Sequence, residues 1–140
     1  MREINHEYYV SLEVAKLLKK AGFGWETKNR WDYCKPIDEW SLRNYPEEPR
    51  NWNSKYYNYD CSAPTLEVAQ RWLREVKNCY TGIDVFVRNL DKNNTYYNRW
   101  FVYFNGARYS GSNYDDTQYY EEAQEAGIKK ALEIILEKGE

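Results

Sequence analysis

The side chains in this sequence with the most evident chemistry are aromatic rings that alternate with arginines between residues 97 and 108. The dipeptide Asn105-Gly106 favours a two-residue type I′ turn, which pairs Tyr103 with Arg108 in a hairpin. Because side chains alternate across a strand, one face of this hairpin carries rings and guanidinium groups. Rings stack on bases at about 1–3 kcal/mol each and guanidinium forks bind phosphate, so the face predicts contact with a nucleotide, a single strand or a protein partner. Its residues are Tyr97, Arg99, Phe101, Tyr103 and Arg108.

A second group of rings lies between residues 25 and 57, in a segment that Pro36, Pro46 and Pro49 interrupt. In one interpretation this segment covers the hairpin face, so that the tyrosines are core and the arginines extend along the surface. In the other it is itself a binding loop, because long loops in compact domains are often functional. The candidate ligand-binding residues here are Trp31, Tyr33, Trp40 and Tyr57.

Residues for metal or nucleophilic catalysis are sparse. His6 is the single histidine, and Cys34, Cys61 and Cys79 form no Cys-x-x-Cys pair, whereas zinc sites need ligands at close spacing. The cysteines are interpreted as buried structural thiols, and no glycine-rich phosphate loop occurs. We therefore expect no catalytic residue, no metal and no cofactor.

Paired carboxylates among rings leave a carbohydrate-active enzyme open as an alternative, since glycoside hydrolases use two acids beside sugar-stacking side chains. Carboxylates also cap helices and solvate loops in proteins of every kind, and that interpretation is favoured. The acids concerned are Asp32, Asp38, Glu39, Glu47, Glu48, Asp60, Asp84, Asp115 and Asp116.

The composition is that of one soluble domain spanning residues 1–140, with 42% apolar and 18% aromatic residues. A net charge of −2 gives no general attraction to duplex nucleic acid or to an anionic membrane. The charged first residues do not resemble a secretory signal, and no apolar run approaches the roughly 20 residues that span a bilayer. Together with the odd number of cysteines, this predicts a cytoplasmic protein.

Three helices are predicted from apolar periodicity and caps. The first begins after Ser11 and ends at Gly22, a typical C′ residue. The second begins after Thr65, with its apolar stripe reaching Val76. The third runs from about residues 115–117 to Lys138, and its early acids suit the helix dipole.

Strands are predicted where the apolar period changes to two, at residues 83–87, 95–104 and 107–110. Residues 25–33 and 55–61 are also interpreted as strands, joined by the proline-containing loop. The resulting order is α-β-β-α-β-β-β-α, an α+β fold with an antiparallel sheet of four or five strands and helices on one face. The core face of the hairpin is predicted to be Trp100, Val102, Phe104, Ala107 and Tyr109.

Three segments resemble an uncharacterised family of small proteins encoded by phages and prophages of gut bacteria. The most specific runs from Ser62 to Leu66 and continues through Ala69 to Trp72-Leu73-Arg74-Glu75-Val76; the others are residues 9–23 and 120–133. The sequence departs from the family pattern at residues 77–78 and at Gly127. The resemblance implies a similar fold and a phage or prophage origin within a bacterial host cell, and it implies no activity.

The expected function is that of a non-enzymatic accessory protein that sequesters a nucleotide-like small ligand, as an anti-defence sponge would. The first alternative is a protein-interaction module that modifies a host protein or forms homo-oligomers through exposed rings. The second is the carbohydrate-active enzyme described above.

Overall fold

The computed structural model describes residues 2–4, 7–44, 48–57, 59–90, 93–111 and 119–138. Within them the chain has three α-helices and antiparallel strands, which confirms the α+β class and the predicted order of the main elements. No helix in this part of the chain is long and apolar enough to cross a membrane. The helices are α1 (Leu12–Ala21), α2 (Leu66–Lys77) and α3 (Tyr120–Glu137).

The predicted caps define the first two helices. Ser11 Oγ accepts from the backbone N–H of Val14, and Gly22 ends α1 in the left-handed region at φ 95°. Thr65 Oγ1 accepts from the N–H of Val68 at the start of α2. The predicted start of the third helix at residues 115–117 lies outside the described residues.

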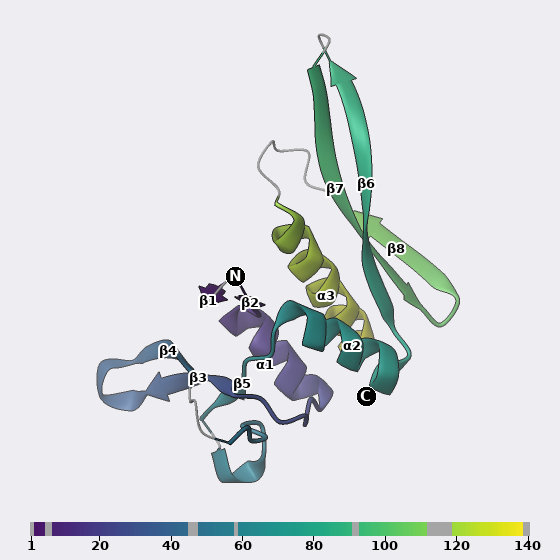
Figure 1. Ribbon diagram of the computed structural model, residues 1–140. Coiled ribbons are helices and arrows are strands. Elements are labelled where there is room, and N and C mark those ends of the chain that lie inside the picture. Colours follow the sequence, from purple (N-terminus) through teal and green to yellow (C-terminus); the bar gives the residue numbers. More distant parts are fainter. Residues whose placement is uncertain are drawn as a thin grey trace.

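The C-terminal strands form one antiparallel sheet, in which β7 is central. The Asn105-Gly106 turn has φ angles of 51° and 77°, as a type I′ turn requires, and it pairs Tyr103 with Arg108 as predicted. Figure 1 shows the β6–β7 hairpin extending away from the helices. The strands are β6 (Tyr80–Leu90), β7 (Asn93–Phe104) and β8 (Ala107–Gly111).

Helix α3 covers one face of this sheet, which we call the inner face. Val102 is fully buried there, and Trp100 packs against the helix at Gly127. A Cβ at Gly127 would lie 3.1 Å from the Cβ of Trp100, so glycine permits the close approach of helix and strand.

The strands of the N-terminal half form sheets of their own, whereas the sequence predicts a single antiparallel sheet of four or five strands. A three-stranded antiparallel sheet has the order β4-β3-β5, and the predicted loop contains β4, which pairs with β3 along six residues. The predicted strand at residues 55–61 is a short 3₁₀ turn, η2 (Lys55–Tyr57), followed by a two-residue strand. The remaining elements are β1 (Arg2–Ile4), β2 (Glu7–Tyr9), β3 (Asn29–Cys34), η1 (Lys35–Ile37), β4 (Glu39–Asn44) and β5 (Cys61–Ser62).

The core lies where the three helices meet β3, β5 and β7. Trp31 enters it from β3, and its indole N–H donates to the backbone oxygen of Val10 at 3.1 Å. Trp72 of α2 packs edge-on against Phe23 with ring centroids 5.3 Å apart. Large aromatic residues such as Trp31, Phe23 and Trp72 thus serve as core, which is how a chain with few aliphatic residues buries enough apolar surface.

Replacing Trp31 by Phe is expected to lower the free energy of unfolding by about 1–3 kcal/mol, because the buried Val10 carbonyl loses its donor and some volume is lost. The half-buried Trp40 provides a matched control, and Trp40→Phe is expected to cost less than about 1 kcal/mol. Urea denaturation of both variants measures the difference. Equal losses would show that the Trp31 indole contact does not contribute as described.

Candidate functional site

The outer face of the β6-β7-β8 sheet is opposite to α3 and carries the predicted rings and arginines. Strand alternation and the observed register place even-numbered residues of β6 and odd-numbered residues of β7 on this face. Tyr80 and Tyr103 are 48% and 45% exposed, so a covering segment does not bury them. The outer face consists of Tyr80, Gly82, Asp84, Phe86, Tyr97, Arg99, Phe101, Tyr103, Arg108 and Ser110.

The rings of the outer face form two pairs, one between β6 and β7 and one within β7. Phe86 and Tyr97 stack with centroids 5.4 Å apart and ring planes 24° apart. Four residues further along β7, about 13 Å in an extended strand, Phe101 packs edge-on against Tyr103 at 5.4 Å. The ring of Phe101 lies over Gly82, its partner on β6, where no Cβ fits.

Arg108 bridges one end of the face. Its guanidinium lies 5.7 Å from the ring centroid of Phe101 and 5.6 Å from that of Tyr103. From there its Nη2 donates to a carboxylate oxygen of Asp84 at 3.0 Å. Both side chains of this ion pair are more than 40% exposed, so the pair contributes little to stability.

Arg99 lies between the two ring pairs, directly across from Asp84 in the sheet register. The Asp84 carboxylate turns toward Arg108, and Arg99 instead lies over Phe86 at 5.5 Å. Within the described part of the chain, Arg99 has no ion pair, and its buried Nε makes no hydrogen bond. Among the described side chains of the outer face, Arg99 is therefore a positive charge without an ion-pair partner.

The Trp-rich segment does not cover this face. Trp31 is core, and because its ring and N–H are already used it adds nothing to an open surface. Tyr33 and Trp40 pair across the β3–β4 hairpin at 5.1 Å, while Tyr57 packs on Trp52 at 4.9 Å. The structure brings together only the five predicted residues of β7 and β8, and the other four lie on separate elements.

Sequence reasoning omitted Tyr80 and Asp84 from the predicted surface. Tyr80 is the register partner of Tyr103, and Asp84 is the carboxylate that binds Arg108. Only the register between β6 and β7 identifies these two residues as part of the outer face. The two strands are joined by Asp91-Lys92, which is not a dipeptide diagnostic of a hairpin and lies outside the described residues.

Two of the predicted candidate acids, Asp32 and Asp60, form a cluster around Arg30. Arg30 Nε lies 2.9 Å from an Asp32 oxygen, and Nη1 lies 3.1 Å from an Asp60 oxygen. The guanidinium also lies 4.3 Å above the ring of Trp52. The arginine joins the two acids instead of leaving them on opposite sides of a sugar-sized gap, so this pair supports the fold rather than glycoside hydrolysis.

The cysteines differ in their surroundings. Cys61 and Cys79 are buried, and burial raises the pKa of the Cys79 thiol to about 11, which makes it a poor nucleophile. Cys34 is exposed, which corrects its prediction as a buried thiol. Among the described residues no group of three or more His, Cys, Asp or Glu side chains could hold a metal ion. His6 lies outside the described residues.

Comparisons with protein-family models, curated proteins and solved structures find no match to this chain. The resemblance to a phage-encoded family therefore stays a prediction. The outer face has to be interpreted from its own chemistry.

The Asp60 cluster predicts a pH dependence of stability. Burial, then a hydrogen bond to Asp32, raises the pKa of Asp60 from 3.8 to about 6, and the charge of Arg30 opposes this. The folded state therefore holds this proton more tightly than the unfolded state, and the resulting stabilisation is lost as pH rises from about 4 through 6. Asp60→Asn abolishes this titration.

Urea denaturation between pH 4 and 7 measures the effect. The free energy of unfolding of the unmodified protein is expected to fall by about 1–2 kcal/mol relative to Asp60→Asn over this range. A difference between the two proteins that does not change with pH would contradict the coupling.

Proposed function

We propose that the protein binds a nucleotide-like ligand on the outer face and does so without catalysing a reaction. The observation that carries the proposal is Arg99, whose guanidinium has no carboxylate partner among the described residues and lies between aromatic pairs on an open sheet. Stacking of bases on rings and binding of phosphate by guanidinium groups are the two contacts that a nucleotide requires.

The exposure of the rings and arginines indicates which of them would contact the base and which the phosphate. Tyr80 and Tyr103 are half-exposed neighbours, and their rings offer the most open surface for a base. Arg99 and Arg108 then lie on the side of these rings toward Phe86, where a phosphate would follow the base. Because a guanidinium that lies over a ring still presents N–H groups at its edge, ring contact and phosphate binding are compatible.

The proposed biological role joins this surface to the family resemblance. A cytoplasmic accessory protein of phage type could sequester a signalling nucleotide of the host by binding alone. Such a role needs rings and guanidinium groups and no catalytic residue, in agreement with the chemistry assigned to the outer face.

Isothermal titration with cyclic di-AMP and with ADP-ribose tests the proposal. At least one of the two is expected to bind, and Arg99→Ala is expected to weaken that binding roughly 10- to 100-fold, the value of a charge-assisted hydrogen bond. The matched control is Arg74→Ala, which removes an exposed guanidinium from α2.

Thermal unfolding of both variants confirms that they are folded. Absence of binding by either nucleotide at millimolar concentration would exclude the proposal for these ligand classes. Equal weakening by the two arginine variants would show that charge in general, and not the outer face, binds the ligand.

A second candidate function is self-association through the inner face beyond α3. There Val85, Val87 and Tyr96 are 58%, 50% and 65% exposed. Strand β6 is at the edge of its sheet in the described part of the chain, and such an edge can pair with the same strand of a second copy. Two-fold pairing would bring the two apolar strips together.

Light scattering tests this alternative. A dimeric mass is expected for the unmodified protein and a monomeric mass for Val85→Lys/Val87→Lys. Val76→Lys, which changes an exposed valine of α2, should remain dimeric. A monomeric mass for the unmodified protein at high concentration would contradict self-association and leave the nucleotide proposal untouched.

A further inference from the structure

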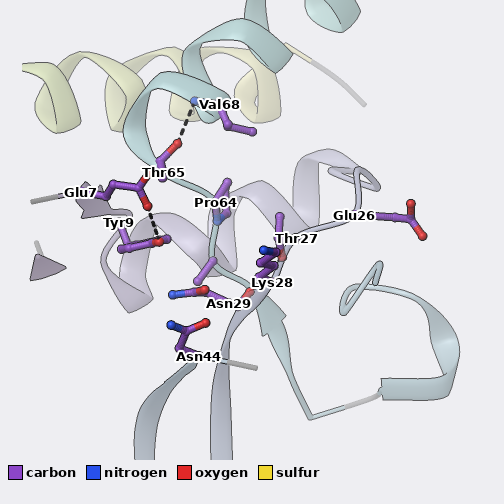
Figure 2. A pocket seen from close by; sticks show the side chains of 11 residues that line it. Glu7, Tyr9, Glu26, Thr27, Lys28, Asn29, Asn44, Pro64, Thr65 and Val68 are labelled. Carbon is purple, nitrogen blue, oxygen red and sulfur yellow. Dashed lines mark hydrogen bonds between the residues drawn. The ribbon is translucent and has the colours of Figure 1, made fainter. Parts of the chain in front are cut away.

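A cavity of about 410 Å³ lies where β2 and the start of β3 meet the first turn of α2. None of the residues that line it belongs to the outer face. Its volume is within the range of small-molecule sites. One part of its wall is apolar, formed by Ala63, Pro64 and Val68, and the rest is mainly polar. Figure 2 shows these side chains around the cavity.

The most unusual group in the wall is the side chain of Asn29, which is 2% exposed. Its amide nitrogen is buried and makes no hydrogen bond in the described part of the chain. A buried donor without an acceptor costs about 1–3 kcal/mol, and in native proteins such groups are few. Asn44, the register partner of Asn29, lines the same cavity, and Figure 2 shows the two amides side by side.

Beside Asn29 lies a tyrosine–carboxylate pair. Tyr9 donates its hydroxyl proton to Glu7 Oε2 at 2.8 Å. Burial, followed by the hydrogen bond to Glu7 and its charge, raises the pKa of Tyr9 to about 12, so the hydroxyl stays protonated. The Asn29 side chain lowers this pKa as a hydrogen-bond partner of the Tyr9 hydroxyl, but the contact of its amide nitrogen falls short of full hydrogen-bond geometry.

We propose that this cavity binds a small uncharged molecule that carries an amide group. The ligand carbonyl oxygen would accept from the Asn29 amide, and the ligand N–H would donate to the Glu7 carboxylate. The remainder of the molecule would lie against Pro64 and Val68. The site is independent of the outer face and of the function proposed for it.

The charge of the wall favours an uncharged ligand over an anion. Glu7 is part of the tyrosine pair that borders Asn29, and an anionic group bound to the Asn29 amide would lie near this carboxylate. Binding also requires the Tyr9 side chain to shift, because the Asn29 nitrogen is closed to water in the unbound state. Tyr9 belongs to β2, a strand of three residues that forms a β-bridge with Thr65.

Nicotinamide and nicotinate form a matched pair of probes, because they share a ring and differ only in amide against carboxylate. In a titration followed by backbone amide NMR, nicotinamide is expected to shift the signals of Asn29, Thr65 and Val68. Nicotinate is expected to bind at least tenfold more weakly.

Two variants locate the contact. Glu7 is exposed, and Glu7→Ala removes the carboxylate that is the proposed hydrogen-bond acceptor. This variant is expected to weaken nicotinamide binding roughly tenfold, which is the value of one hydrogen bond to a charged group. Glu26→Ala is the control, because Glu26 borders the same cavity and Figure 2 shows it pointing away from Asn29. The affinity of the Glu26→Ala variant for nicotinamide should be unchanged.

Three results would overturn the proposal. The first is the absence of any shift with nicotinamide at millimolar concentration, which is expected if a water molecule alone satisfies Asn29. The second is equal binding of nicotinamide and nicotinate. The third is an equal effect of the two glutamate variants on nicotinamide binding. Loss of nucleotide binding at the outer face would change none of these outcomes, so the two proposals fail separately.

Discussion

The alternation of side chains along β7 is the constraint on which the candidate site depends. Helix α3 packs against the face that carries Trp100 and Val102, and its approach at Gly127 is close enough to bury Val102 completely. Because successive side chains of a strand point to opposite faces, burying these residues directs Arg99, Phe101 and Tyr103 to the other side. A slip of one residue would bury a guanidinium beneath α3, so the core contact fixes both the register and the composition of the outer face.

The elements that could be predicted from the sequence are those determined by local interactions. The hairpin of β7 and β8 depends on two residues, Asn105 and Gly106, whose positive φ angles only a few residue types adopt. The starts of α1 and α2 depend on the hydroxyls of Ser11 and Thr65, each within three residues of its donor. Once the position of the turn is known, the alternation of side chains along β7 and β8 assigns each residue of the hairpin to one of its two faces.

The Trp-rich segment could not be predicted in the same way, because its contacts are distant in sequence. The Trp31 N–H reaches a carbonyl 21 residues away, and the Trp52 N–H reaches the carbonyl of Thr27 25 residues away. The same indoles would suit a binding loop equally well if those partners were absent. The buried amide of Asn29 could not be predicted at all, because a single asparagine in a sequence does not indicate whether its amide is hydrogen-bonded after folding.

The rings of the outer face do not by themselves require a ligand. Cross-strand aromatic pairs such as Phe86 with Tyr97 stabilise a sheet, and a ring over Gly82 shields a strand that lacks a side chain there. Arg99 lies over the ring of Phe86, yet it has no ion pair within the described part of the chain. A carboxylate stands directly across from it, at Asp84, yet that group binds Arg108 on the third strand instead. The proposed binding of an anionic, ring-bearing partner therefore depends on Arg99, which lies between two aromatic pairs and has no ion pair within the described part of the chain.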